Sequence, residues 1–338
     1  MKIIVPMAGM GKRMRPHTLT VPKPLIPIAG KPIVQRLVED IVKVCGEAVE
    51  EVAFIIGPTF GAAVEKQLRQ IAESVGAKGS ISYQDEPLGT AHAILCAQHA
   101  LEGPIVVAFA DTLFKADFTL DTSADGTIWV QRVEDPRPFG VVKVNDEGII
   151  TELVEKPDTF VSDLAIIGIY YFKDGAYLKR ELQYLLDNNI KDKGEFQLTN
   201  ALENMKNQGT RFIPGRISEW LDCGNKDATV YTNQRYLEYL QEREPGALVD
   251  PSAVLEDAVL IPPVYIARGV TIRRAVVGPH VSVGDLSVIE DSVLKNSIVQ
   301  TNTRVVGSVI ANSMLGNFVT YVGRPKDLSL GDYNALAD

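Results

Sequence analysis

The first half of the chain alternates two spacings of apolar residues. Short β-branched runs bounded by Gly, Pro or Asp predict buried strands over Lys2–Met7, Glu51–Ile56, Ile81–Gln84 and Ile105–Ala110. Between them, apolar residues three and four apart predict amphipathic helices over Ile33–Val44, Ala62–Val75 and Ala91–Ala100. This alternation indicates βαβ units and therefore an α/β fold, in which helices cover both faces of a mostly parallel sheet. Ligands of such sheets bind at the carboxyl ends of the strands.

The middle of the chain is first rich in strands and then helical. Strands are expected over Thr127–Val133, Gly140–Val144, Ile150–Glu155 and Ile166–Phe172. Helices are expected over Gly175–Asn188, Leu198–Asn207 and Thr229–Gln241. The helical spacing then breaks at the run Glu242-Arg243-Glu244-Pro245-Gly246. We therefore predict a first domain over residues 1–241, a linker over 242–251 and a second domain over 252–338.

The second domain has a different pattern. Between Ser252 and Val322, 22 residues are Val or Ile, and they lack a helical period. Many aliphatic residues recur five to seven positions apart: Val264, Val270, Val276, Val281, Val288, Val293, Ile298 and Val305. This period predicts a β-helix, in which successive coils bury one another's aliphatic corners; a β-sandwich is the alternative. A β-helix of few coils exposes apolar corners and open ends, so we expect a homo-oligomer.

Composition narrows the class of protein. The chain has 338 residues, 46% hydrophobic and 23% charged, which is typical of a soluble protein of about two domains. No apolar run approaches the roughly 18 residues that a membrane span needs. The first residues lack the features of a secretory signal, and the three cysteines are far apart without a CxxC pair. We expect a cytoplasmic protein with no membrane partner.

The charge is unevenly distributed. The net charge of -9 argues against a general nucleic-acid binder, because such proteins usually carry a basic excess. Residues 1–38 nevertheless contain no Asp or Glu, and they hold Lys2, Lys12, Arg13, Arg15, Lys23, Lys31 and Arg36. This local excess predicts that a small anion binds near the N-terminus.

Two segments in this basic region indicate phosphate chemistry. The run Ala8-Gly9-Met10-Gly11-Lys12-Arg13 follows the first strand, and its glycines let backbone N–H groups approach a phosphate. It matches neither the dinucleotide-binding fingerprint nor the P-loop. The alternative is therefore an ordinary turn whose basic side chains are exposed to solvent. In Pro22–Pro32, four prolines surround Lys23 and predict a stiff, non-helical backbone for that lysine. A preorganised cation suits charge that develops on a phosphoryl group, although a proline-rich surface loop would look the same.

Taken in order, these segments resemble the sugar-1-phosphate nucleotidylyltransferases. The resemblance covers about residues 1–240 and continues through Gln84 with Pro87-x-Gly89-Thr90-Ala91-His92, Asp111, Phe139-Gly140-Val141-Val142, Glu155-Lys156-Pro157, Gly194-Glu195 and Trp220-Leu221-Asp222-Cys223-Gly224. The family implies a Rossmann-like nucleotide-diphospho-sugar transferase domain with a mixed, mostly parallel sheet. Its longer members add a C-terminal left-handed β-helix, as the tail pattern also predicts.

The resemblance implies that a nucleoside triphosphate and a sugar 1-phosphate give a nucleotide sugar and pyrophosphate. It implies dTTP or UTP as the nucleotide and glucose 1-phosphate as the sugar, with Mg²⁺ as cofactor. Arg13 and Lys23 would supply the catalytic charges, and the nucleotide would contact Ala8, Gly9, Gly11, Gln84, Gly89 and Asp111. A side-chain amide such as that of Gln84 can read the N3–H and O4 edge that thymine and uracil share.

The sugar phosphate would contact Gly140, Glu155, Lys156 and Lys193. Asp111 and Asp222 would hold the metal, because Mg²⁺ takes one or two carboxylates together with phosphate and water oxygens. A lone Asp after a strand is also a common helix cap. We interpret His92 as a structural histidine at a helix start, and Trp220 as either a sugar contact or the closure of a sheet edge.

Two other functions compete with this one. A non-catalytic sensor of sugar nucleotides, or a regulatory subunit, would be expected to lose at least one of Arg13, Lys23, Asp111 and Asp222. A second, acyltransferase activity in the β-helix would usually need a histidine base, and the tail has only His280. Lys12, Ala110-Asp111-Thr112 and Asn200 depart from the family's common residues, which leaves the nucleotide and sugar open.

Overall fold

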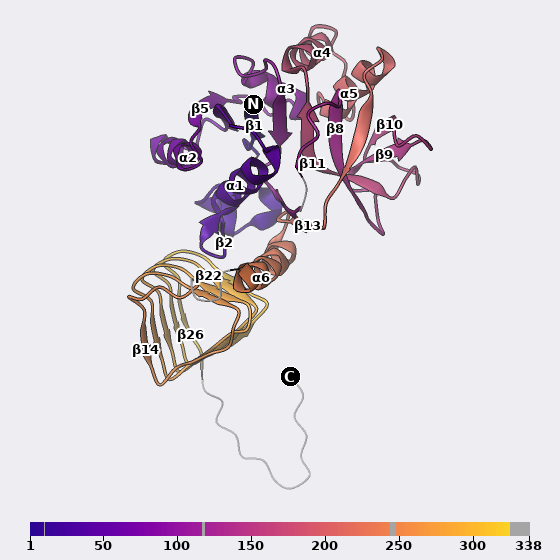
Figure 1. The fold of residues 1–338 in the computed structure, drawn as a ribbon. Helices are drawn as coiled ribbons and strands as arrows, with labels where there is room; N and C mark the ends of the chain where they lie inside the picture. The colour runs from indigo at the N-terminus through magenta and orange to yellow at the C-terminus, as the bar shows by residue number, and fades with distance from the viewer. Residues whose placement is uncertain (10, 117–118, 244–247, 325–338) are drawn as a thin grey trace. The chain divides into compact units, whose positions relative to one another are not determined.

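The computed structural model describes residues 1–9, 11–116, 119–243 and 248–324 (Figure 1). The chain divides into two compact units. The first comprises Met1–Ile26 and Lys31–Ala228, and the second comprises Pro27–Gly30 and the chain from Thr229 onward.

The first unit is built on a nine-stranded sheet with the order β10-β9-β11-β6-β1-β4-β5, in which β8 pairs with β11 and β12. β11 is antiparallel to β6, β8 and β9, and β10 is antiparallel to β9. All the other strands run in one direction, so the sheet is mixed and mostly parallel. The strands are β1 (Lys2–Pro6), β4 (Glu51–Ile56), β5 (Lys78–Tyr83), β6 (Ile105–Ala108), β8 (Gly126–Arg132), β9 (Gly140–Val144), β10 (Ile150–Glu155), β11 (Leu164–Phe172) and β12 (Phe212–Arg216).

Helices cover both faces of this sheet. They are α1 (Ile33–Cys45), α2 (Ala62–Ser74), α3 (Thr90–Cys96), α4 (Gly175–Asp187) and α5 (Leu198–Asn207). The crossovers β1-α1-β4 and β4-α2-β5 move outward from β1, whereas β5-α3-β6 returns to its other side. Because such crossovers are right-handed, α1 and α2 lie on one face and α3 on the other, next to α4 (Figure 1). The strand order reverses at β1, which is where ligands bind in sheets of this kind.

The core beneath α3, α4 and α5 joins alternate residues of the sheet to the helices. Ile4, Ile55 and Val107 point from three neighbouring strands into this layer and are fully buried. Leu178 of α4 and Leu202 of α5 pack into the same cluster. This continuous apolar layer fixes the positions of the strand ends, where the candidate site lies.

The predicted fold class is confirmed, but three features were not anticipated. β12 was missed, as was a separate two-stranded sheet of β7 (Thr112–Lys115) and β13 (Glu219–Asp222). The chain also forms the 3-10 turns η1 (Lys12–Met14), η2 (His17–Leu19) and η3 (Lys23–Leu25). The prediction of a non-helical backbone at Lys23 was therefore wrong. Pro24 lies in the first turn of η3, where the fixed φ of proline favours a helical turn.

The second unit contains α6 from Thr229 (the helix spans Lys226–Arg243) and three stacks of short parallel strands (Figure 1). Segment Pro27–Gly30 adds β2 (Pro27–Ile28), which pairs with β3 (Lys31–Pro32). The first stack is β14 (Val254–Glu256), β17 (Thr271–Arg273), β20 (Val288–Glu290), β23 (Arg304–Val306) and β26 (Thr320–Val322). The second is β15 (Val259–Leu260), β18 (Val276–Val277), β21 (Val293–Lys295) and β24 (Val309–Ala311). The third is β16 (Val264–Ile266), β19 (Val281–Val283), β22 (Ser297–Val299) and β25 (Met314–Leu315).

This arrangement confirms the predicted β-helix and rules out the β-sandwich. Residues one coil apart lie side by side, as Val254 does with Thr271 and Val288 with Arg304, and the parallel stacks are consistent with a left-handed β-helix. Most of the named aliphatic residues are buried between coils, as predicted, so they do not supply the exposed corners on which the expectation of a homo-oligomer rested. Val264, Val270, Val281 and Val305 are at most 3% exposed, because each turns into the coil interior and packs on the next coil.

The domain boundary stays a prediction. The contacts within the structure place Thr229–Gln241 in the second unit, and α6 continues to Arg243. Of the predicted linker over 242–251, residues 244–247 lie outside the described part of the chain. No helix in the described ranges is long and apolar enough to cross a membrane.

Candidate active site

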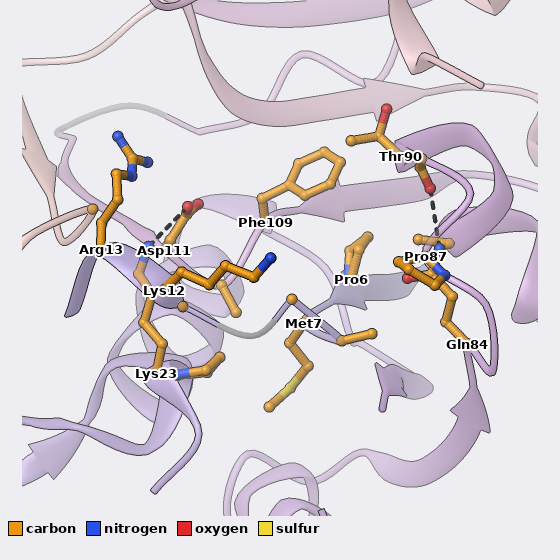
Figure 2. Close-up of a pocket in the computed structure, with 18 of the residues that line it drawn as sticks. Pro6, Met7, Lys12, Arg13, Lys23, Gln84, Pro87, Thr90, Phe109 and Asp111 are labelled. Atoms are coloured by element: carbon orange, nitrogen blue, oxygen red, sulfur yellow. Dashed lines mark hydrogen bonds and ion pairs between the residues drawn. The ribbon is translucent and has the colours of Figure 1, made fainter. Parts of the chain in front are cut away.

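A cavity of about 550 Å³ opens at the carboxyl ends of β1, β5 and β6 (Figure 2). This volume is within the usual range for a small-molecule site. The segments that follow these three strands supply most of its wall. The lining residues are Pro6, Met7, Ala8, Gly9, Gly11, Lys12, Arg13, Lys23, Pro24, Gln84, Pro87, Gly89, Thr90, Ala93, Phe109, Ala110, Asp111, Glu195 and Gly224.

The two glycines of the first loop have different physical roles. Gly11 has a φ of 58°, and a Cβ there would lie 2.8 Å from Cβ of Lys23, so both backbone and packing require glycine. Thr18 Oγ1 donates a 2.8 Å hydrogen bond to the Gly11 carbonyl and holds this turn. A Cβ at Gly9 would meet no described atom within 4 Å. Gly9 thus leaves open space beside the cavity, where a ligand can approach the backbone.

Lys23 is brought to the cavity by η3 and is only 7% exposed. Its Nζ donates a 3.0 Å hydrogen bond to Oδ2 of Asp111, which follows β6 (Figure 2). A buried ammonium needs such a partner, because leaving the charge unpaired away from water is costly. The structure therefore unites two residues that the sequence assigned to one site.

The β7–β13 pairing brings Asp222 to the same place. Asp222 is the last residue of β13 and lies opposite Thr112, the first residue of β7. The Cys223 backbone N–H donates a 3.0 Å hydrogen bond to the Asp111 carbonyl. Two carboxylates that are far apart in the sequence thus become neighbours through a two-stranded sheet.

The charges of this group act on one another. Burial raises the pKa of Asp222, and the negative charge of Asp111 raises it further. Lys23, the Gly224 N–H and Arg13 oppose this shift. Arg13 is close enough that a Cβ on Gly224 would lie 3.3 Å from its guanidinium nitrogen. Two carboxylates, of Asp111 and Asp222, and two cationic side chains, of Lys23 and Arg13, therefore share one small, partly buried region.

The two carboxylates fit the oxygen donor set that Mg²⁺ prefers. In the described part of the chain, no group of three or more His, Cys, Asp or Glu side chains is placed to hold a metal ion. A metal at Asp111 and Asp222 would therefore complete its coordination with water and substrate oxygens. This is the usual arrangement for Mg²⁺ in phosphoryl chemistry.

The far end of the cavity contains Gln84 and Gly89. Gln84 follows β5, and its Nε2 donates a 3.1 Å hydrogen bond to the Gly89 carbonyl. The same nitrogen lies 3.2 Å from Nδ1 of His92, which is not among the described residues that line the cavity. Gly89 has a φ of 120°, and a Cβ there would lie 2.4 Å from the Phe196 carbonyl oxygen. Backbone and amide groups thus form a polar end wall.

Gly140, Glu155, Lys156 and Lys193 come together in a second group. Lys156 Nζ lies 3.4 Å from Glu155 Oε1, and Lys193 Nζ donates a 2.7 Å hydrogen bond to the Lys156 carbonyl. A Cβ on Gly140 would lie 3.0 Å from Glu155 Oε2. None of the four is among the described residues that line the 550 Å³ cavity.

Aromatic packing connects this second group to β13. The Lys156 N–H donates a 3.1 Å hydrogen bond to the carbonyl of Phe139. The Phe139 ring meets Trp220 edge to face, with centroids 5.0 Å apart. Trp220 lies two residues before Asp222, so this contact joins the predicted sugar residues to the acidic pair.

Sequence reasoning left several lining residues out of the predicted site. Lys12, Thr90, Phe109 and Glu195 all line the cavity, and Figure 2 shows the first three around it. Thr90, Phe109 and Glu195 lie within or beside motifs that carry the family resemblance. A motif does not reveal which of its side chains points into the cavity.

Comparisons with known proteins bear on the fold and the family. Among solved structures, UDP-glucose pyrophosphorylase complexed with UDP-glucose aligns with a TM-score of 0.58 and 24% identity, over 70% of this chain and 98% of that chain. At this identity the likeness shows the fold alone.

Three curated relatives extend the comparison. The low-salt glycan biosynthesis nucleotidyltransferase of Haloferax volcanii is 29% identical over 99% of each chain. A glucose-1-phosphate thymidylyltransferase of Streptomyces griseus is 28% identical over 99% of this chain and 98% of its own. The mannose-1-phosphate guanylyltransferase catalytic subunit beta of Danio rerio is 31% identical over 75% of this chain and 73% of its own.

The family model described as nucleotidyl transferase matches residues 2–239, which include every strand and helix that contributes to the cavity. The confirmed fold, the charged cavity and this match lead to one conclusion: the chain belongs to the nucleotidyl transferase family.

Proposed function

We propose that the protein transfers a nucleotidyl group from dTTP or UTP to a sugar 1-phosphate. A phosphate oxygen of the sugar 1-phosphate attacks the α-phosphorus of the nucleotide. The bond from that phosphorus to the bridging oxygen breaks, and pyrophosphate leaves with the electron pair. The observation that carries the proposal is the convergence of Arg13, Lys23, Asp111 and Asp222 beside one cavity.

Positioning and charge neutralisation dominate a reaction of this type. Gly9 and Gly11 would let backbone amides approach the triphosphate, and Arg13 would hold its β and γ oxygens. Lys23 would neutralise charge at the α-phosphate, where a buried ammonium acts more strongly than one in water. Asp111 and Asp222 would hold Mg²⁺, which when bound neutralises phosphate charge.

The contacts of Gln84 support the binding of a pyrimidine base at the far end of the cavity. The Gln84 Nε2 donates a hydrogen bond to the Gly89 carbonyl and lies within hydrogen-bond distance of His92 Nδ1. The amide carbonyl is therefore oriented by its neighbours and can accept the N3–H that thymine and uracil share. Gly89 lines the cavity beside Gln84, so the ring would lie against its backbone.

Glucose 1-phosphate is the sugar that we propose. Glu155 would accept hydrogen bonds from sugar hydroxyls while Lys156 and Lys193 would pair with the phosphate. Their connection to Asp222 through Phe139 and Trp220 supports a role for this group beside the reacting phosphates. Substrate would have to draw Lys156 from its present 3.4 Å pairing with Glu155.

Neither competing function gains a specific observation. The four charged groups that a non-catalytic subunit would be expected to lose are all present and close together. His280, the base that acyl transfer would need, is 19% exposed at its side chain, and its Nε2 lies 2.9 Å from Oε1 of Glu238.

A pyrophosphate-release panel tests the proposal. dTTP, UTP, CTP, ATP and GTP are each combined with the 1-phosphates of glucose, mannose, galactose and N-acetylglucosamine, with Mg²⁺ or excess chelator. We expect the fastest release with dTTP or UTP and glucose 1-phosphate, and none in chelator. Lys23→Ala from the same preparation controls for contaminating enzymes. If no pair exceeds this control, the proposal is wrong; preference for a purine would overturn only the assignment of the base.

A further inference from the structure

The four-residue segment Pro27–Gly30 comprises β2 and the turn, Ala29 and Gly30, that connects β2 to β3. First-unit residues flank it on both sides in sequence, yet its contacts place it in the second unit. Ile28 and Ala29 are 0% and 1% exposed. The segment begins four residues after Lys23, so one end of the lysine's loop is covalently continuous with a part of the second unit.

Asn233 of α6 binds this turn. It is fully buried, and its Oδ1 accepts a 3.0 Å hydrogen bond from the Ala29 N–H and a 2.7 Å hydrogen bond from Ser282 Oγ. Ser282 belongs to β19, so one oxygen ties the turn to a β-helix strand. Asn233 Nδ2 has no partner among the described residues, which costs free energy for a buried donor. The side chain therefore acts here as an acceptor.

A second contact fixes the turn from another side. Gly30 has a φ of 85°, and a Cβ there would lie 2.1 Å from the ring of Tyr265. Tyr265 lies in β16, in the same stack as Ser282. The turn backbone is thus held between α6 and two β-helix strands, all of them parts of the second unit.

The chain from this turn to Lys23 is stiff. Pro24 and Pro27 have φ fixed by their rings. The Ile26 N–H donates a 3.1 Å hydrogen bond to the Lys23 carbonyl, and the Leu25 N–H donates one of 2.9 Å to Pro22. A displacement of the turn is therefore carried to Lys23 with few soft torsions to absorb it. Lys23 has little room to adjust, since its ammonium is buried against Asp111.

We infer that Asn233 is a positioning residue through which the second unit sets the placement of Lys23. The inference rests on the proposed function for its effect on turnover, but the mechanical link is independent of it. Because about 1 Å of misplacement at a reacting centre can cost about 100-fold in rate, a small shift of this turn is sufficient. Any change in the β-helix unit that moves Ser282 or Tyr265 would alter nucleotidyl transfer.

The test compares Asn233→Ala with Ser287→Ala in the full chain. Ser287 is a matched control because it is also fully buried in the second unit and makes two hydrogen bonds through Oγ. It bonds to Gln300 and Thr303, away from the turn. We expect both variants to lower Tm. Only Asn233→Ala should lower kcat, by about 10-fold to 100-fold, with the KM for the nucleotide changed less than about twofold.

Hydrogen exchange by mass spectrometry supplies a readout that needs no activity. Protection of the peptide containing Leu25, Ile26 and Ala29 should fall in Asn233→Ala and not in Ser287→Ala. Equal kcat in the two variants, or equal protection, would overturn the inference. If Asn233→Ala does not fold, Tyr265→Leu removes the second contact and should give the same pair of changes. If wild-type protein releases no pyrophosphate, the proposed function fails, and the exchange data still decide whether the turn is coupled to Asn233.

Discussion

Single residues of the site show that the fold is not optimised for its own stability there. Burial and the neighbouring Asp111 both raise the pKa of Asp222, so the ionised form is held at a cost. Lys23 and Arg13 offset part of this cost. Such opposed charges are typical of a site that awaits charged ligands.

Asp222→Asn should stabilise the metal-free protein while abolishing activity. The folded pKa of Asp222 lies above its ordinary value of 3.8, so between those two values the folded state binds more protons than the unfolded state. Stability therefore falls as pH rises through that window, and the penalty persists at pH 7. Asparagine removes the charge and keeps an acceptor for the Gly224 N–H. We expect a higher Tm at pH 7 in chelator, an unchanged Tm below the window, and a loss of about 100-fold or more in pyrophosphate release. A lower Tm at pH 7 would contradict this account.

Lys23→Ala and Arg13→Ala should damage turnover more than nucleotide binding. Their charges are placed where negative charge shifts during the reaction, and interactions that strengthen in the transition state appear in kcat. We expect kcat to fall by about 100-fold for Lys23→Ala, as for loss of other preorganised charge donors. Calorimetry with the triphosphate should show a much smaller change in Kd. Lys12→Ala, which removes an exposed cation from the same cavity, provides the comparison. Lost affinity with unchanged kcat would disprove the assigned roles.

At the scale of elements, the sequence predicts what depends on local spacing. The bounds of β9, β10 and α5 agree with the predicted segments because each is a compact apolar pattern between turn residues. The β7–β13 pairing could not be predicted, because it joins Thr112 to Asp222 across more than a hundred residues of chain. The 3-10 turn at Lys23 was missed because proline suits a first helical turn as well as an extended loop. The candidate residues and their division into nucleotide and sugar-phosphate groups came from motifs, whereas the contacts that bring Lys23, Asp111 and Asp222 together required the fold.

Gly89→Ala should destabilise the protein through the start of α3. The backbone there has a φ of 120°, and the added Cβ would lie 2.4 Å from a carbonyl oxygen that cannot move freely. We expect a loss of about 3 kcal/mol or more in the free energy of unfolding measured in urea. Gly61→Ala is the control, because Gly61 is the residue before α2 and has a φ of 81°, but a Cβ there would meet no described atom within 4 Å. The control should lose only about 1 kcal/mol. Equal losses would show that backbone strain alone makes glycine necessary at position 89.

At the scale of the whole chain, the sides of the β-helix differ in chemistry. The stack of β16, β19 and β22 has its outward Ser282 and Ile298 buried, and Ser282 bonds to Asn233 of α6. The stack that begins with β14 carries the ion-paired ladder of Glu256, Arg273, Glu290 and Arg304. The stack of β15, β18, β21 and β24 aligns Val259, Val276, Val293 and Val309 in register on its outer surface. Three of these valines, Val259, Val293 and Val309, are 54%, 42% and 84% exposed.

The row of Val259, Val276, Val293 and Val309, here called the valine ladder, is the physical reason to expect a homo-oligomer. The aliphatic corners named from the sequence are mostly buried and do not provide one. A registered row of exposed β-branched side chains is an apolar surface that proteins usually cover with a partner. We expect light scattering to give a mass above that of one 36.9 kDa chain, and the double variant Val293→Lys and Val309→Lys to move it toward the monomer. The matched control, Thr320→Lys with Thr271→Lys, adds the same charge to the ion-paired stack and should leave the assembly intact. Val293, Val309 and Thr320 are exposed, and Thr271 is half-buried. We expect neither variant to disturb the coil interior, and melting curves would verify this. A wild-type protein that is monomeric at micromolar concentration, or an assembly unchanged by lysines in the valine ladder, would show that this surface is tolerated in water and that the chain functions without a second copy.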